Sequence, residues 1–199
     1  MLRRCLGFFN GSKKTAARLR ILTLMMYVYK KYFLHLHKRV FIDMKELKIT
    51  TNVRVYQYDE LVEEDKILVD KAKAMTENSY APYSKFHVGA AVLLSNGKIV
   101  GGSNQENAAF PSGTCAERTT VYYAHSKYPE AKFEKLAIAA KKDGKFTSCP
   151  VSPCGACRQS ILEYETLGKQ PVKIYLYGDD GIYVVDRVAD LLPLHFDSF

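Results

Sequence analysis

The chain has 199 residues and a formal net charge of +8, which is enough for one globular domain with its own hydrophobic core. The excess of positive charge is concentrated near the N-terminus. Residues 1–43 carry ten Lys or Arg and a single acid, Asp43, whereas residues 44–199 carry 19 Lys or Arg and 20 acids. This larger part therefore gives no support for the basic face that nucleic-acid binding requires, and we expect no nucleic-acid partner.

Residues 1–43 form a segment with a composition of its own. An apolar run at residues 21–29 lies between basic clusters and is too short to span a bilayer. We interpret residues 1–43 as a basic extension that is poorly structured or not part of the native protein, with Met44 as an alternative start. A transit peptide or a basic membrane-surface helix is a further alternative. We expect no membrane partner.

Residues 44–199 alternate between helix and strand signals. Residues 59–78 place apolar side chains at helical spacing, with acids early and lysines later, which predicts a helix. The turn Ser95-Asn96-Gly97 predicts a hairpin of strands 88–94 and 98–103. The remaining predicted helices are 115–126 and 154–164, and the remaining predicted strands are 135–140, 172–177 and 182–186. Such alternation predicts a layered α/β domain.

Three of the five cysteines share one pattern. Cys115 begins a Cys-Ala-Glu-Arg run, and Cys154 and Cys157 form a Cys-x-x-Cys pair that begins thirty-nine residues after Cys115. Three thiolates can hold a zinc ion and leave its fourth tetrahedral position for water. Glu117 lies two residues after the first cysteine, where a carboxylate can handle the protons of that water. The pattern predicts a catalytic zinc site with these three ligands and Glu117 as general acid/base.

A structural zinc site is the alternative interpretation of the same cysteines. Such a site is normally closed by a fourth protein ligand. The candidates His87, His125 and Cys149 do not stand at conventional ligand spacing, so we favour the catalytic site. Cys5 and Cys149 lie in different parts of the chain and suggest no disulfide framework, which fits a reducing cytoplasm. We expect a cytoplasmic protein.

The motifs resemble those of the small homotetrameric cytidine deaminases over roughly residues 55–196. Besides the two cysteine runs, the resemblance rests on Tyr83-Ser84-Lys85-Phe86-His87-Val88-Gly89-Ala90-Ala91, on Asn104-Gln105-Glu106-Asn107-Ala108 and on Leu191-Leu192-Pro193. It implies a three-layer α/β/α sandwich with a mixed central sheet, one Zn²⁺ per subunit and a homotetramer. The implied reaction is hydrolytic deamination of cytidine and 2′-deoxycytidine to the uridines in pyrimidine salvage, with the glutamate acting as acid/base and not as a ligand.

The resemblance also implies roles for residues that bind the substrate or support the metal. Phe86 would lie against the pyrimidine ring, and the backbone at Ala116 would contact the base. Asn104 and Glu106 would hydrogen-bond the ribose hydroxyls, which would reject ligands that leave these groups unpaired. Arg118 would hydrogen-bond a ligand sulfur.

Two aromatic residues are expected, by resemblance, to reach the site of a neighbouring subunit. They are Phe110 and Phe196. Phe110 stands where the family commonly has Tyr, so a hydroxyl is lost while a ring that can stack is kept. His195, just before Phe196, stands where the family tends to have Ser.

Two alternative functions stay open on the sequence alone. One is deamination of another cytosine nucleoside such as blasticidin, against which Asn104 and Glu106 argue because they imply a free ribose. The other is a zinc-structured nucleic-acid binding module that uses the basic N-terminus, and this alternative leaves Glu117 without a purpose. A free cytosine nucleoside is therefore the expected substrate.

Overall fold

The computed structural model describes residues 13–40 and 45–197. The chain divides into two compact units, Met1–Lys48 and Ile49–Phe199. The predicted boundary after residue 43 and the candidate start at Met44 lie outside the described residues, as does Cys5. The division into a 1–43 extension and a 44–199 domain stays a prediction.

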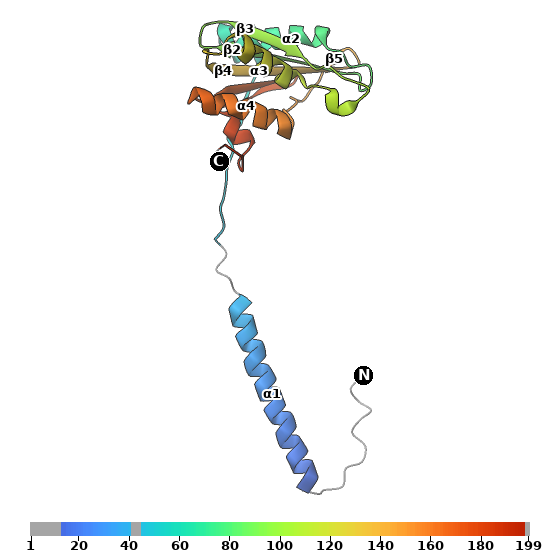
Figure 1. Ribbon diagram of the computed structural model, residues 1–199, viewed down its shortest axis with the longest axis vertical. Helices are drawn as coiled ribbons and strands as arrows, with labels where there is room; N and C mark the ends of the chain where they lie inside the picture. Colours follow the sequence, from blue (N-terminus) through green and yellow to red (C-terminus); the bar gives the residue numbers. More distant parts are fainter. Residues whose placement is uncertain (1–12, 41–44, 198–199) are drawn as a thin grey trace. The chain divides into compact units, whose positions relative to one another are not determined.

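Among the described residues of the first unit, helix α1 runs without interruption from Lys13 to Val40 (Figure 1). The sequence analysis instead expects a poorly structured segment here. The helix contains neither Gly nor Pro and is rich in Leu, Met, Lys and Arg, which are good helix formers. In the part of the chain that the structure describes, no helix combines the length and the apolar character that a bilayer span needs.

The second unit is built on a mixed sheet with the strand order β1-β7-β6-β4-β2-β3, in which β5 pairs with β4. The pair β4–β6 is parallel and the other pairs are antiparallel. The strand bounds are Arg54–Tyr56 for β1, Phe86–Leu94 for β2, Ile99–Ser103 for β3, Phe133–Lys142 for β4, Lys145–Phe146 for β5, Lys173–Gly178 for β6 and Gly181–Val185 for β7.

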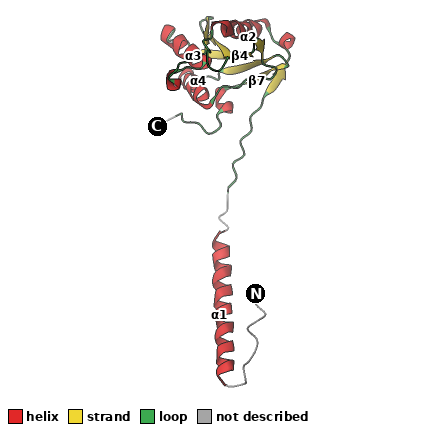
Figure 2. Cartoon of the chain, turned by 90° about the vertical axis from the view of Figure 1, so that its right-hand side faces the viewer, coloured by secondary structure: helices red, strands yellow, loops and turns green. Residues whose placement is uncertain are grey.

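Helices cover both faces of this sheet. Helix α2, Glu63–Met75, lies on one face, and helices α3, Ala116–Lys127, and α4, Gly155–Gly168, lie on the other (Figure 2). Alternate residues of β2 supply the two cores, because successive side chains of a strand point to opposite faces. Ala90 and Val92 belong to the core under α3 and α4, and Ala91 and Leu93 belong to the core under α2. The predicted three-layer α/β/α sandwich with a mixed central sheet is confirmed.

The predicted strands and helices are found close to their predicted bounds. The predicted helix 59–78 is narrower as α2, because short 3-10 helices, Tyr58–Glu60 and Thr76–Asn78, flank it. The sequence patterns do not predict β1 and β5. These strands have 3 and 2 residues, too few to show a period of hydrophobicity.

Close contacts between helix and sheet fix the two segments that carry the cysteines. A Cβ on Gly102 of β3 would lie 2.6 Å from Thr120 Oγ1 on α3, so only glycine allows this approach. Thr120 Oγ1 also donates to the carbonyl of Ala116, 2.7 Å away, in the first turn of α3. A Cβ on Gly178 of β6 would lie 2.5 Å from the carbonyl oxygen of Ser148, in the loop that leads to α4. The cysteine-bearing ends of both helices therefore rest on a rigid sheet.

Candidate functional site

Three cysteine sulfurs meet between the N-terminal ends of α3 and α4. Cys115 is the N-cap of α3, Cys154 is the N-cap of α4, and Cys157 lies in the first turn of α4. The three Sγ atoms all lie within 4.8 Å of one another, and those of Cys154 and Cys157 are 3.5 Å apart. A tetrahedral zinc ion with Zn–S bonds of about 2.3 Å holds its sulfurs about 3.8 Å apart, so this donor set fits zinc.

The cluster contains three protein ligands and no fourth. Across residues 13–40 and 45–197, His87, His125 and Cys149 do not join the three sulfurs. A zinc site with three protein ligands keeps a coordination position for water or substrate, as catalytic sites do, whereas structural sites are normally closed by four. The structure therefore favours the catalytic interpretation over the structural one.

Positive charge surrounds the sulfurs. The helix N-termini at Cys115 and Cys154 present unpaired N–H groups and the positive ends of two helix dipoles. A hydrogen bond from the Cys157 thiol, assisted by the Arg118 guanidinium, lowers the pKa of Cys115 to about 5. The same hydrogen bond and burial raise the pKa of Cys157. Metal ligation requires thiolates. A metal cation that replaces the proton between Cys115 and Cys157 would therefore keep both sulfurs as thiolates.

Arg118 is the charged partner of the cluster. Its guanidinium donates a hydrogen bond to the Cys115 sulfur, and that bond is the main reason why the pKa of Arg118 is raised above its ordinary value. Its Nε is a buried donor that finds no acceptor among the described residues. Arg118 thus lies near enough to Cys115 for each group to shift the pKa of the other, and its role as a hydrogen-bond donor to a ligand sulfur stays a prediction.

Glu117 is buried beside the same sulfurs. It is the second residue of α3, and only 5% of its surface is exposed. Burial raises the pKa of its carboxyl above the usual range, while a hydrogen bond from the backbone N–H of Glu117 itself and a smaller contribution from the Cys157 thiol act in the opposite direction. A carboxyl with a raised pKa can exchange protons nearer to neutral pH, which is the property that a general acid/base needs.

A pocket of about 560 Å³ lies beside the cluster. Cys115 and Arg118 line it together with the predicted residues Asn104, Glu106 and Phe110. The other lining residues are Tyr83, Ser84, Gln105, Asn107, Gly113 and Thr114. The sequence analysis includes Tyr83 and Ser84 in a family motif without giving them a role. Their position two and three residues before the motif's Phe86 is the signal that could have found them.

The amide of Asn104 is partly used by the backbone of β2. Its Oδ1 accepts the N–H of Val88 at 2.8 Å, and its Nδ2 donates to the carbonyl of Phe86 at 2.9 Å. A carboxamide has two N–H groups and two oxygen lone pairs, so the Asn104 side chain keeps one N–H donor and one lone pair for a ligand. Asn104 thus holds the beginning of β2 in place while it lines the pocket.

The carboxylate of Glu106 holds the loop before β2. It accepts the N–H groups of Tyr83, at 2.9 Å, and Ser84, at 3.2 Å, and the hydroxyl of Ser84. The hydrogen bond from the Ser84 hydroxyl is the main reason why the pKa of Glu106 is lowered. A carboxylate has about four lone-pair sites, so the residue keeps room for one more donor.

Two predicted substrate residues do not line this pocket. Phe86 is half-buried at the first position of β2, and Ala116 is fully buried at the first position of α3. The structure brings Phe86 to the site through its carbonyl, which binds Asn104. The stacking of Phe86 on a base and the backbone contact at Ala116 stay predictions.

The two candidate neighbour-site aromatics are both on the surface. Phe110 is 76% exposed and Phe196 is 65% exposed. The Phe110 ring meets Tyr83 edge-to-face, with 6.0 Å between the ring centres, at the rim of the pocket of its own subunit. The carbonyl of Phe196 accepts a 2.6 Å hydrogen bond from Gln159 on α4. Their contact with a neighbouring subunit stays a prediction.

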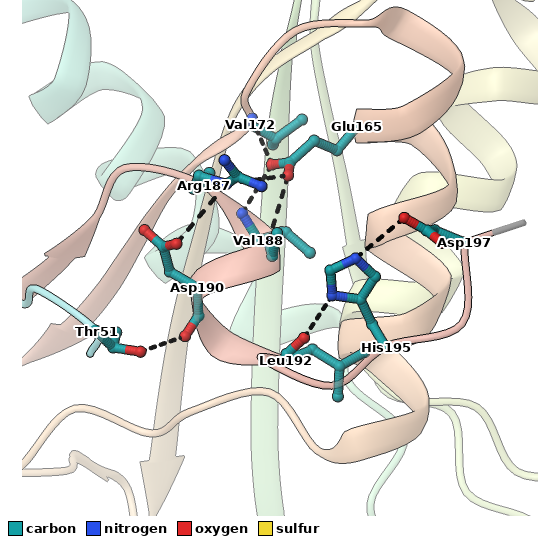
Figure 3. A network of polar contacts seen from close by, with 10 residues as sticks. Thr51, Glu165, Val172, Arg187, Val188, Asp190, Leu192, His195 and Asp197 are labelled. Atoms are coloured by element: carbon teal, nitrogen blue, oxygen red, sulfur yellow. Dashed lines mark hydrogen bonds and ion pairs between the residues drawn. The ribbon is translucent and has the colours of Figure 1, made fainter. Parts of the chain in front are cut away.

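A buried carboxylate connects α4 to the C-terminal segment (Figure 3). Glu165 accepts the N–H groups of Val172 at 2.9 Å and Val188 at 2.8 Å, and it lies 3.9 Å from the Arg187 guanidinium. His195 Nδ1 lies 2.7 Å from the Leu192 carbonyl. The sequence analysis does not single out Glu165, because a glutamate on a helix is usually solvated. The network fixes the chain before Phe196 to the helix that carries Cys157.

Comparisons with known proteins agree with this fold and site. A family model described as the cytidine and deoxycytidylate deaminase zinc-binding region matches residues 62–170. A cytidine deaminase of Halalkalibacterium halodurans is 40% identical over 133 residues, which are 67% of this chain and 94% of the relative. One of Sporosarcina psychrophila is 44% identical over 131 residues, which are 66% and 90% of the two chains.

A solved structure shares the fold. The crystal structure of a cytidine deaminase from Burkholderia pseudomallei matches with a TM-score of 0.55 and 37% identity, over 65% of this chain and 97% of that one. The chain belongs to the cytidine and deoxycytidylate deaminase family. This finding confirms the predicted resemblance and zinc as the cofactor, and it leaves the roles of individual residues as predictions.

Proposed function

We propose that this chain catalyses the hydrolytic deamination of cytidine and 2′-deoxycytidine to uridine and 2′-deoxyuridine, with release of ammonia. The observation that carries the proposal is the buried carboxyl of Glu117 beside three cysteine sulfurs, one of which, Cys115, belongs to a residue that lines a pocket. Two relatives that match most of their length to this chain are called cytidine deaminases. Their names support a free nucleoside as the substrate.

The cysteine cluster would hold the metal. When bound by Cys115, Cys154 and Cys157, zinc acts as a Lewis acid that makes water a nucleophile at neutral pH. Three thiolates carry one more negative charge than a divalent cation balances. Nearby positive groups must therefore stabilise the negative charge on the sulfurs if the zinc is to acidify water. The Arg118 hydrogen bond to Cys115 and the two helix N-termini supply that correction.

Glu117 would move the protons of the reaction. Water adds its oxygen to ring carbon 4, the exocyclic C–N bond breaks and the amine leaves as ammonia, so one proton of water ends on the neighbouring ring nitrogen and the other on the departing nitrogen. The Glu117 carboxylate takes one proton from the attacking water, delivers it to the neighbouring ring nitrogen, and later assists the departure of ammonia. Its raised pKa favours transfer in both directions.

The pocket walls would recognise the nucleoside. Asn104 and Glu106 each keep hydrogen-bonding capacity after their bonds to the chain are counted, which suits two adjacent ribose hydroxyls. Phe86 would pack against the pyrimidine ring, and the backbone at Ala116 would contact the base. Sites built to pair polar groups discriminate strongly against ligands that lack them.

We also propose a cytoplasmic homotetramer that acts in pyrimidine salvage, with residues 44–199 as the catalytic domain. Phe110 and Phe196 are large, exposed aromatics, and aromatic side chains are enriched where subunits meet. Phe110 lies at the rim of the pocket, where a neighbouring subunit would close the site. Free cytosine nucleosides, and not polynucleotides, would be the substrates.

The test is the loss of ultraviolet absorbance of cytidine and 2′-deoxycytidine with the full chain, run beside a sample from which zinc has been removed by a chelator. We expect rapid loss only in the metal-loaded sample, and return of activity when zinc is restored. Activity that survives chelation, with no zinc detectable, would contradict a zinc mechanism. Turnover of blasticidin without turnover of either nucleoside would replace the proposed substrate.

A further inference from the structure

Helix α1 has two unlike faces between Leu19 and Phe33. At 100° per residue, Arg20, Thr23, Tyr27, Lys30 and Lys31 fall within an arc of about 100°. We call this arc the basic face. Every other side chain from residue 19 to residue 33 is Leu, Ile, Val, Met, Phe or Tyr, and together they cover the remaining arc of about 220°. We call this the apolar face.

The apolar face is exposed. The large apolar side chains between Leu19 and Phe33 are 44% to 72% exposed. Within this face, the rings of Tyr29 and Phe33 stack one turn apart, with 5.6 Å between their centres. A continuous apolar surface of this size marks an interaction site in a water-exposed protein. The zinc chemistry of the second unit does not use it.

The charge of the segment identifies the kind of partner. Helix α1 contains no Asp or Glu from Lys13 to Val40, so a second copy would bring cations together without any opposite charge to pair them. The apolar face is also much wider than the narrow seam of a coiled coil. A polynucleotide would satisfy the basic face but would leave the apolar face in water.

An anionic lipid surface satisfies both faces. Interfacial helices bury a wide apolar face at the boundary of headgroups and acyl chains, and they carry Lys and Arg on the opposite face. Tyrosines such as Tyr29 and Tyr32 are favoured at this depth, because their rings are apolar and their hydroxyls reach water. No helix among the described residues has the length and apolar character that crossing a bilayer needs, and α1 would therefore lie in the plane of the surface.

We propose that α1 docks the chain on an anionic lipid membrane, with the apolar face in the membrane interface and the basic face toward the lipid headgroups. This replaces the expectation of no membrane partner for the N-terminal extension. It does not depend on the proposed deaminase activity, because every residue that carries it lies outside the second unit.

The test measures binding of the full chain to vesicles by sedimentation. We expect the chain to bind vesicles of phosphatidylcholine with phosphatidylserine. Its affinity for phosphatidylcholine alone should be lower by on the order of a hundredfold, since each of three basic residues near an anionic surface contributes about fivefold to the affinity. The triple variant Arg20→Gln, Lys30→Gln, Lys31→Gln should lose a similar factor on the anionic vesicles. Added salt should weaken binding of the unmodified chain.

A matched pair of variants separates the faces. Met25→Ser with Tyr29→Ser removes apolar surface from the apolar face, and it should weaken binding about a hundredfold, since two buried large side chains are lost. Thr23→Ser with Tyr27→Ser introduces two serines on the basic face, with a smaller loss of apolar surface, and should bind nearly as well as the unmodified chain. Both pairs leave the charge unchanged.

Three outcomes would overturn the proposal. The first is the absence of binding to anionic vesicles while the circular dichroism spectrum shows a folded chain. The second is equal weakening by the two serine pairs, because the faces would then not differ. The third is tight binding to a polyribonucleotide, or self-association without lipid, that competes with vesicles and disappears in the Met25→Ser, Tyr29→Ser variant.

Discussion

The two halves of the candidate active site are built differently. The metal half consists of cysteines and Glu117 at the N-terminal ends of two helices that pack on the central sheet; Cys157 and Glu117 are buried, Cys115 is partly buried and Cys154 is exposed. The substrate half consists of a loop before β2 and a loop after β3, where Glu106 is partly exposed and Phe110 is exposed. The metal half is therefore complete within one chain, whereas the substrate half has the exposure of a surface that another subunit would cover.

Removal of one ligand should produce the largest effect. In Cys157→Ser, the buried thiolate is lost and two sulfurs are left for the metal, so we expect loss of bound zinc and a fall in kcat of about a thousandfold or more. Zinc content by elemental analysis and kcat for cytidine are the measurements. Cys149→Ser, which changes an exposed cysteine outside the cluster, is the control and should keep both. Full zinc in Cys157→Ser would remove this cysteine from the ligand set.

The carboxylate of the substrate half should matter next. Glu106→Gln replaces a charged acceptor for a hydroxyl by a neutral amide, so kcat/KM for cytidine should fall by about tenfold to a hundredfold, with zinc content unchanged. The same variant should act on free cytosine, which has no ribose, at the rate of the unmodified chain. Glu130→Gln, at an exposed position away from the pocket, serves as the control. Equal falls in kcat/KM for the nucleoside and for the free base would show that Glu106 does not bind the ribose.

Glu165 should affect stability more than chemistry. Its carboxylate accepts backbone N–H groups from Val172, Val188 and Ala189, so Glu165→Gln should lower the free energy of unfolding by about 1–3 kcal/mol. Urea unfolding gives this value. Glu163→Gln, on the exposed side of the same helix, should change it little. An unchanged midpoint in Glu165→Gln would show that the network of Figure 3 contributes nothing to stability.

The smallest effect should come from the C-terminal aromatic. Phe196→Ala should raise KM several-fold, because the side chain would close a neighbour's pocket, while Leu194→Ala, at another exposed position of the same segment, should not. Mixed assemblies of Phe196→Ala chains with inactive Glu117→Gln chains test the sharing directly. A low KM restored in the mixture would support a borrowed residue. A high KM in the mixture would confine the role of Phe196 to its own chain.

The metal half is the part that the sequence predicts well. A three-residue spacing between Cys154 and Cys157, and the spacing of Cys115, Glu117 and Arg118, place these side chains in the first turns of helices through local geometry alone. The structure then brings the two helix ends together with the sulfurs within 4.8 Å. The alternation of strands and helices predicts the layered fold for the same local reason.

The rest depends on contacts between distant parts of the chain. Asn104 binds the backbone of β2, and Glu106 binds the loop before it. These hydrogen bonds join residues 16 to 23 positions apart in the sequence, and no local sequence pattern predicts them. Strands β1 and β5 form only because a neighbouring strand is present to pair with them. A basic membrane-surface helix is only the alternative prediction for the segment of α1, because its low content of acids and its short apolar run suggest a loose tail, although its residues favour a helix.

The most direct test of the account is the Glu117→Gln variant, with zinc content and kcat for cytidine measured on the same sample. The account predicts that zinc stays at one ion per chain, since the three sulfurs are untouched, and that kcat falls by about 10²- to 10⁴-fold because the proton carrier is lost. A variant that keeps both its zinc and its normal kcat would contradict the assignment of Glu117 as the acid/base on which the proposed reaction rests.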